Sequence, residues 1–258
     1  MRPAARIIGA ILLTLLVVVV ARAQTRTTIA AASDLQFSLK EVEAAFEADG
    51  HPAVDLVFGS SGTLAKQIQD GAPFEVFMSA DESYVQTLVT AGLTKDGGVL
   101  YAVGRVVVFA PTGSPLQPDP ELKNLAALLA KGGVTRFAIA NPEHAPYGRA
   151  AEAVLRKRGL WDRLQPMLVL GENITQAAQF ATTGNAVGGI IAYSLVLSPA
   201  LKDRGTFALL PESDHAPLRQ RMVRLKKAGA AADAFYAFVQ SAKARPILTK
   251  YGFALPGQ

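Results

Sequence analysis

Apolar and polar residues alternate along the chain in a way that predicts short buried strands, each followed by a helix. Residues 27–32 form a β-like apolar run, and residues 33–50 place Leu35 and Leu39 on one helical stripe that Gly50 ends. The predicted strands are 27–32, 54–59, 74–80, 103–111, 136–140, 167–171, 187–194, 207–211 and 218–225. The predicted helices are 33–50, 63–70, 81–92, 120–133, 148–159, 175–184 and 231–248.

This alternation predicts an α/β fold with mostly parallel sheets. A barrel of eight strand–helix units is the alternative, but the last third of the chain breaks the alternation. The predicted strands 207–211 and 218–225 follow each other without a helix between them. We therefore expect two open sheets, each flanked by helices.

The first 23 residues have the pattern of a secretory signal peptide. Arg2 and Arg6 precede an apolar run at 7–20, and Ala21 and Ala23 occupy the small-residue positions of a cleavage site. An N-terminal membrane anchor is the alternative, but the run falls short of the roughly 18 apolar residues that span a bilayer. We expect cleavage after Ala23, export to the periplasm and a soluble mature protein.

Charge and cysteine content narrow the range of partners. The formal net charge of +5 falls to +2 without the three leader arginines, with 23 basic and 21 acidic residues left. The basic stretches 156–158 and 219–227 come closest to a nucleic-acid footprint, but the second alternates with apolar residues like a strand. The chain has no cysteine, which excludes disulfides, thiol chemistry and a lipid anchor on a leader cysteine.

Two loops that follow predicted strands carry serines at a helix entrance. Ser33 and Gln36 have the spacing of a capping box, and capping is the favoured interpretation of that loop by itself. In the second loop, Ser60 and Ser61 stand between two glycines in FGSSGTLA. An N-cap role explains one of these serines but not both. Flanking glycines allow backbone N–H groups to approach a ligand closely.

Of three later loops, two add free amides at helix entrances. Tyr147 opens a helix after a proline-stiffened loop, and Asn173 is a predicted N-cap that leaves the amides of Ile174 and Thr175 near the tip. Tyr193 ends a predicted strand, where its side chain either packs in the core or points into a cleft.

The five loop tips contain no lysine or arginine except Arg149. Helix N-termini carry partial positive charge and unpaired N–H groups, so they bind anions without help from a cation. Ligands of open α/β sheets bind beyond the carboxyl ends of the strands. The loops together therefore predict an uncharged site for an oxyanion.

Signs of catalysis are weak. His51, His144 and His215 lack metal-ligand spacing, and the chain has no G-x-S-x-G motif and no dinucleotide fingerprint. We expect no enzyme activity and no cofactor. An exported hydrolase that uses Ser61 with His144 is the remote alternative.

Five segments of the chain together resemble the periplasmic molybdate-binding proteins of ABC importers. They are AAASDL (30–35), FGSSGTLAKQIQDGAPFEVFMSAD (58–81), NPEHAPYG (141–148), GIIAYS (189–194) and KYGF (250–253). The resemblance implies a type II periplasmic binding protein fold, in which two lobes close on the ligand. One lobe would comprise 24–104 and 217–258 and the other 105–216, with crossings near 103–106 and 213–219.

The resemblance also implies a set of ligand-binding residues. The hydroxyls of Ser33, Ser61 and Tyr193 and the amides of Ser33, Ser61, Tyr147 and Ile174 would hold the oxyanion. Molybdenum would be present only within that anion. Asp34 stands where some relatives have a neutral residue, and it places a carboxylate of undetermined orientation near the site. The implied partners are the membrane subunits of an ABC transporter, and we expect a monomer.

The chemistry of the anions separates some of the possible ligands. Molybdate and tungstate are dianions that only accept hydrogen bonds. Hydrogen phosphate would aim its proton at a donor, which costs about 1–3 kcal/mol in a buried site. Sulfate also only accepts, so cavity size alone can exclude it. A site for another tetrahedral oxyanion such as sulfate is therefore the alternative function.

Overall fold

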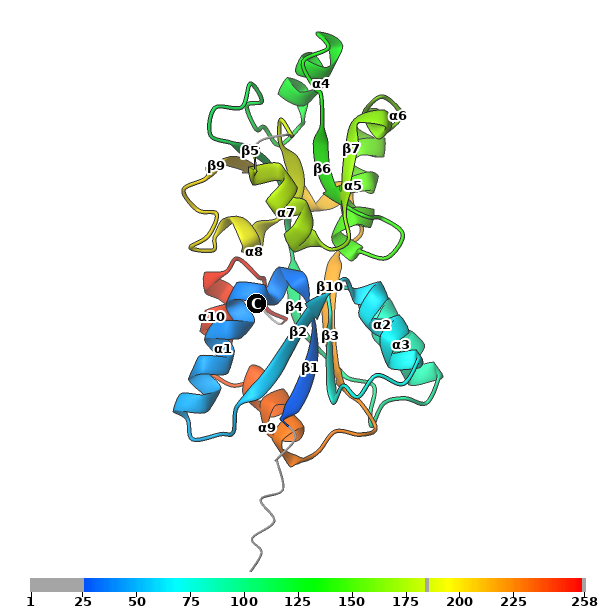
Figure 1. The fold of residues 1–258 in the computed structure, drawn as a ribbon, viewed down its shortest axis with the longest axis vertical. Helices are drawn as coiled ribbons and strands as arrows, with labels where there is room; N and C mark the ends of the chain where they lie inside the picture. The colour runs from blue at the N-terminus through cyan, green and yellow to red at the C-terminus, as the bar shows by residue number, and fades with distance from the viewer. Residues whose placement is uncertain (1–25, 184–185, 257–258) are drawn as a thin grey trace, which may run out of the picture.

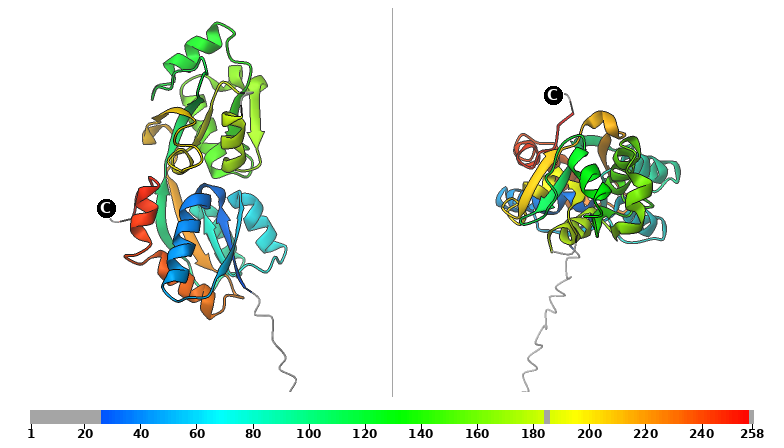
Figure 2. Two further views of the ribbon diagram at one scale, coloured as in Figure 1. Left: turned by 60° about the vertical axis from the view of Figure 1, so that its left-hand side comes forward. Right: turned by 90° about the horizontal axis from the view of Figure 1, so that it is seen from above.

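The computed structural model describes residues 26–183 and 186–256, and they form two β-sheets flanked by helices (Figures 1 and 2). The predicted signal peptide at 1–23 lies outside the described residues. Along the described parts of the chain, no helix combines the length and the apolar character needed to cross a bilayer. The two sheets lie one above the other along the longest axis of the molecule.

The first sheet has the strand order β2-β1-β3-β10-β4. Its strands are β1 (Thr27–Ala32), β2 (Val54–Gly59), β3 (Val76–Ser79), β4 (Val99–Gly104) and β10 (Leu218–Arg224). Its helices are the 3-10 turn η1 (Ser33–Leu35), α1 (Gln36–Ala48), α2 (Ser61–Gln69), α3 (Glu82–Thr90), α9 (Ala230–Val239) and α10 (Arg245–Lys250).

The second sheet has the strand order β7-β6-β8-β5-β9. Its strands are β5 (Val106–Pro111), β6 (Phe137–Ala140), β7 (Leu168–Gly171), β8 (Gly189–Ala192) and β9 (Gly205–Leu209). Its helices are α4 (Lys123–Ala130), α5 (Pro146–Lys157), α6 (Trp161–Leu164), α7 (Ile174–Thr182) and α8 (Tyr193–Val196), with 3-10 turns η2 (Gln165–Met167) and η3 (Glu212–Asp214).

Both sheets are mixed, so the expectation of mostly parallel sheets was wrong. β2, β1 and β3 are parallel, whereas β10 pairs antiparallel with β3 and β4. Likewise β7, β6 and β8 are parallel, whereas β5 pairs antiparallel with β8 and β9. The antiparallel pairs are made by β10 in the first sheet and β5 in the second, the strands that follow the two connections between the sheets. The α/β class and the presence of two open sheets are confirmed.

Two further expectations needed correction. The predicted strand 103–111 is two strands, β4 and β5, which belong to different sheets and meet at Arg105. The predicted helix 231–248 is divided into α9 and α10, because the Ser241 hydroxyl accepts from the amides of Lys243 and Ala244 and so starts a new turn. Pro246 then stands in the first turn of α10, a position that suits a residue without an N–H.

The first sheet is buried on both faces. Ile29 and Ala31 pack in one cluster with α1, α9 and α10, and Ala30 packs in another with α2 and α3. Side chains of a strand point alternately to opposite faces, so β1 reads as a continuous apolar run. A single larger cluster forms the core of the second sheet. Burial on both faces fixes the ends of the strands, where the candidate site lies.

Two chain segments connect the sheets. β4 leads into β5 through Arg105, and the chain returns from β9 to β10 through residues 210–217. On the return, the buried carboxylate of Asp214 accepts from Arg158 and lies 3.0 Å from the Lys157 ammonium. The exact lobe boundaries, 24–104 with 217–258 and 105–216, remain a prediction.

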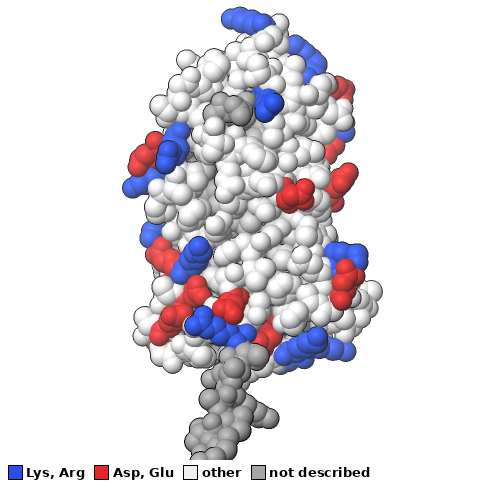
Figure 3. Space-filling view, viewed as in Figure 1, with Lys and Arg blue, Asp and Glu red and all other residues white. Residues whose placement is uncertain are grey.

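The arginines of the two basic stretches, together with Lys157, form ion pairs with neighbouring carboxylates. Their ion-pair partners are Glu82, Asp96 and Asp233 for the arginines of β10, and Glu152 and Asp214 for residues 156–158. On the face seen in Figure 3, charged side chains lie mainly along the edges and the middle is largely uncharged. This distribution agrees with the expectation that β10 is a strand with one solvated face.

Substitution of Phe46 by Ala should lower the free energy of unfolding by about 3–5 kcal/mol, because the deleted ring leaves a cavity. The Phe46 ring is fully buried and lies 5.2 Å from Phe235 and 5.3 Å from Phe238, measured between ring centroids. Urea titration followed by circular dichroism measures the change. Val57→Ala, at a residue that is 37% exposed, is the control. A loss below about 1 kcal/mol for Phe46→Ala would contradict the assigned core.

Candidate functional site

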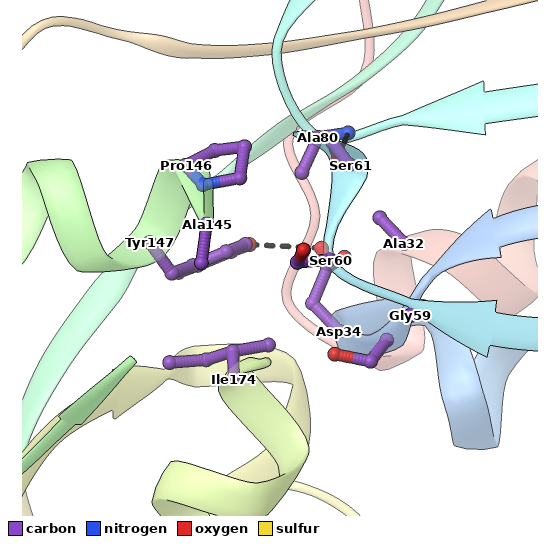
Figure 4. A pocket seen from close by; sticks show the side chains of 11 residues that line it. Ala32, Asp34, Gly59, Ser60, Ser61, Ala80, Ala145, Pro146, Tyr147 and Ile174 are labelled. Atoms are coloured by element: carbon purple, nitrogen blue, oxygen red, sulfur yellow. Dashed lines mark hydrogen bonds between the residues drawn. The ribbon is translucent and has the colours of Figure 1, made fainter. Parts of the chain in front are cut away.

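A small cavity lies where the two sheets meet, beyond the carboxyl ends of the parallel strands. Its empty space is about 180 Å³, less than the roughly 300–1,000 Å³ of sites for drug-sized ligands. Tyr147 and Ile174 lie on one side and Asp34, Gly59 and Ser60 on the other (Figure 4). The lining residues are Ala32, Ser33, Asp34, Gly59, Ser60, Ser61, Ala80, Ala145, Pro146, Tyr147 and Ile174.

Helix N-termini from both sheets point at this cavity. Ser61 is the first residue of α2, Tyr147 the second of α5, and Ile174 the first of α7. The first N–H groups of a helix have no partner within it and carry partial positive charge. The lining that the structure describes contains no Lys, Arg or His. The helix starts therefore bring partial positive charge to the cavity without a basic side chain, and the carboxyl of Asp34 lies beside them.

Ser33 lies in this cavity and does not cap a helix, so the capping-box interpretation was wrong. Helix α1 begins at Gln36 and has no side-chain cap, because the 3-10 turn η1 stands between the strand and the helix. The Ser33 hydroxyl instead lies 3.4 Å from the Thr175 amide of α7, and the Ser33 carbonyl accepts from the Thr175 hydroxyl at 2.9 Å. Ser33 thus joins the two sheets.

The two serines between the glycines have separate roles. Ser60 is the N-cap of α2, since its hydroxyl accepts from the Thr63 amide at 3.3 Å. The Ser61 hydroxyl is fully buried and accepts from the Ala80 amide at 2.9 Å. A hydroxyl that already accepts one hydrogen bond still has its own hydrogen to donate. Ser61 can therefore donate into the cavity while its oxygen is held in place.

The second sheet contributes two backbone amides. Asn173 caps α7 as predicted, and its side chain accepts from the amides of Thr175 and Gln176 at 3.1 Å each. The amide of Ile174 stands before them at the start of the helix. Ala145, before α5, makes no side-chain cap, so the first turn of α5 at Tyr147 keeps donors for a ligand.

Tyr193 is not among the residues that line the cavity. It opens the short helix α8, its amide donates to the Arg105 carbonyl at 2.9 Å, and its ring centroid lies 5.7 Å from that of Phe207. The structure thus brings together Ser33, Ser61, Tyr147 and Ile174 but not the Tyr193 side chain.

Asp34 is the cavity residue whose orientation the sequence left open. Its Oδ2 accepts from the Tyr147 hydroxyl at 2.9 Å and from Gln220 Nε2 at 2.5 Å. Gln220 in turn accepts from the Tyr101 hydroxyl at 2.7 Å.

Burial raises the pKa of the Asp34 carboxyl to about 6, against the opposing effect of hydrogen bonds from Gln220 and Tyr147. Burial, with Asp34 nearby, also raises the pKa of Tyr101 well above its usual range.

The sequence contained one clue to this network. Gln220 is fully buried in β10 between Leu218 and Met222, on the face of the strand that is otherwise apolar. A polar residue in the apolar register of a strand needs a partner, and here the partner is the acid from η1.

Contacts across the cavity hold the two sheets together in this arrangement. The Gly62 amide donates to the His144 carbonyl at 3.0 Å, and the Ser194 hydroxyl donates to the Asp34 carbonyl at 2.8 Å. Arg149, the one cation at the loop tips, binds Asp81 at 2.6 Å and does not line the cavity.

The Ser61–His144 pair of the hydrolase alternative is not found among the described hydrogen bonds. His144 Nδ1 lies 2.9 Å from the Ser60 hydroxyl, whereas the described hydrogen bonds of Ser61 include none to His144. Ser60 is itself engaged in capping α2. Among the described residues, no group of three His, Asp or Glu side chains is placed to hold a metal ion.

Residues 27–254 match the family model of the bacterial extracellular solute-binding proteins. The chain belongs to this family. The molybdate-binding protein ModA of Rhodobacter capsulatus is 39% identical over 228 residues, which cover 87% of this chain and 86% of that protein. The solved periplasmic molybdate-binding protein of Azotobacter vinelandii has a TM-score of 0.81 and 30% identity, covering 90% of this chain and all of that chain. These solute-binding relatives confirm the resemblance and the periplasmic binding protein fold.

The sulfate-binding protein SubI of Mycobacterium tuberculosis has a TM-score of 0.72 at 17% identity, covering 90% of this chain and 88% of that chain. At that identity, the likeness shows a shared fold alone.

Substitution of Gly62 by Ala should keep the two sheets of this solute-binding protein apart. An added Cβ would lie 2.7 Å from the His144 carbonyl oxygen and 2.8 Å from the Tyr84 hydroxyl, although Gly62 itself is at an ordinary backbone angle. Small-angle X-ray scattering should give a larger radius of gyration than for the native protein. Gly97→Ala, with open space around it, is the control. A radius equal to that of the native chain would show that Gly62 does not limit closure.

Proposed function

We propose that this protein binds molybdate, and also tungstate, in the periplasm and delivers it to the membrane subunits of an ABC importer. The observation that supports this most is the convergence of three helix N-termini, from both sheets, on one small cavity whose described lining has no basic side chain. Relatives named for molybdate binding match the chain over most of its length.

The proposed contacts combine hydroxyls with backbone amides. The hydroxyls of Ser33 and Ser61 and the amides of Ser33, Ser61, Tyr147 and Ile174 donate to oxygens of the anion. Every contact is to an oxygen and none to the metal. The resemblance also includes the Tyr193 hydroxyl, and we keep it as a proposed contact although Tyr193 is not among the residues that line the cavity.

A site made of donors suits a dianion that only accepts hydrogen bonds. Charge-assisted hydrogen bonds contribute roughly 1.5–3 kcal/mol each, and helix termini add about 0.3–1 kcal/mol each. Desolvation and closure of the lobes offset much of this sum. A net 8–12 kcal/mol corresponds to a dissociation constant of about micromolar to nanomolar.

The cellular setting follows from the leader and the family. The pattern at 1–23 directs export, and we propose that the mature chain is a periplasmic monomer without a resident cofactor. Solute-binding relatives act without catalysis, and the engagement of Ser60 and Ser61 in structural hydrogen bonds agrees with that role.

A panel of anions tests the proposed ligand by thermal unfolding. Molybdate or tungstate at 100 times the dissociation constant stabilises the folded state by about 2.7 kcal/mol, which raises the melting temperature by about 5–10 °C. Sulfate and phosphate at the same concentration should raise it by less than about 1 °C, because sulfate is smaller and hydrogen phosphate carries a proton. A larger shift with sulfate than with molybdate would overturn the proposal.

Substitution of Ser61 by Ala should weaken molybdate binding tenfold or more, since one charge-assisted donor is lost and each decade corresponds to about 1.4 kcal/mol. The Ala80 amide also loses its partner, so a moderate fall in melting temperature is expected without loss of the fold. Isothermal titration calorimetry measures the affinity, with Ser83→Ala on α3 as the control. Unchanged affinity in Ser61→Ala would remove this residue from the site.

A further inference from the structure

Asp34 is a buried acid that lines the cavity with one oxygen occupied and one free. The residue is 1% exposed, and its Oδ1 has no hydrogen-bond partner among the described residues. Buried polar atoms of folded proteins are almost always paired, so an orphan at a ligand site points to a partner that arrives with the ligand.

The hydrogen bonds around Asp34 fix which oxygen is an acceptor. Gln220 accepts from Tyr101 through Oε1, so its Nε2 faces Asp34 and donates to Oδ2. The Tyr147 hydroxyl donates to the same oxygen. Because Oδ2 already accepts hydrogen bonds from two donors, a proton bound by the carboxyl would be on Oδ1.

An acceptor-only anion cannot pair with a bare carboxylate oxygen, because both atoms accept and both carry negative charge. A proton on Oδ1 turns this repulsion into a hydrogen bond from the acid to the anion. We propose that Asp34 takes up one proton when the oxyanion binds and donates it from Oδ1 to an oxygen of the anion. This inference rests on the proposed binding of molybdate.

Burial favours the neutral form of Asp34, and its hydrogen bonds oppose this effect. The groups that face the carboxyl are Tyr147 of α5, Gln220 of β10, the backbone amides of Asp34 and Leu35 and, beyond Gln220, Tyr101 of β4. Ser194 of α8 binds the Asp34 backbone carbonyl. None of these described partners carries a charge at neutral pH. Burial already raises the pKa of Asp34 to about 6 without any anion present, and a dianion beside it would raise that pKa further.

The proposal predicts how the affinity for molybdate changes with pH. The pKa of Asp34 is higher in the bound state than in the free state, so the affinity is highest at pH values at which Asp34 of the free protein is protonated. Affinity is lost as the pH rises above the free-state value, by up to tenfold per pH unit.

Calorimetry of the native protein tests the proposal without any substitution. Molybdate is titrated at pH 7.5 in two buffers with different enthalpies of protonation, and the difference in heat gives the protons taken up. We expect close to one proton per molybdate, and the affinity should fall at least tenfold between pH 6 and pH 8. Molybdate binding with no proton uptake would overturn this inference and leave the proposed function standing.

Asp34→Asn provides a matched variant, because the amide keeps an acceptor for Tyr147 and Gln220 and places a permanent donor at the Oδ1 position. Proton uptake should vanish and the affinity should no longer fall with pH. Asp55→Asn, at an exposed carboxylate of β2, should keep the native proton uptake and pH dependence. Persistent proton uptake in Asp34→Asn would show that another group takes the proton. Absence of molybdate binding by the native chain would overturn the proposed function and this inference together.

Discussion

The buried hydrogen-bond donors at the junction of the two sheets need acceptors. A bound anion supplies these acceptors and so stabilises the arrangement in which the two sheets meet. Helix starts at Ser61, Tyr147 and Ile174 bring unpaired N–H groups to one small cavity. Neither sheet alone can satisfy them, because the donors come from both. A small anion that accepts hydrogen bonds in all directions satisfies them together, so binding and closure stabilise each other.

The fold supplies these donors through strand direction. In each sheet, three parallel strands end at the same edge, and the loops beyond them start helices that face the other sheet. Contacts that use only backbone, such as the bond from the Gly62 amide to the His144 carbonyl, let the two edges approach closely. The cations near the junction are engaged elsewhere, as Arg149 is with Asp81. The partial positive charge that faces the cavity therefore comes from helix dipoles.

Much of this arrangement could be predicted from local patterns, and the failures share a physical cause. The cap at Asn173, the strands and the clustering of Ser33, Ser61, Tyr147 and Ile174 depend on neighbours within a few residues or on the common edge of a sheet. The role of Ser33 in joining the sheets, the place of Tyr193 and the bond from Gln220 to Asp34 depend on contacts between residues far apart in the chain. Periodicity and capping rules contain no information about such contacts.

A high-resolution crystal structure of the mature protein with molybdate bound tests the central claim most directly. The account predicts the anion between the starts of α2, α5 and α7, with amide and hydroxyl donors from both sheets about 2.7–3.1 Å from its oxygens. A lysine or arginine side chain bonded to the anion would contradict the account. So would an anion held by one sheet alone, with the other standing away from it.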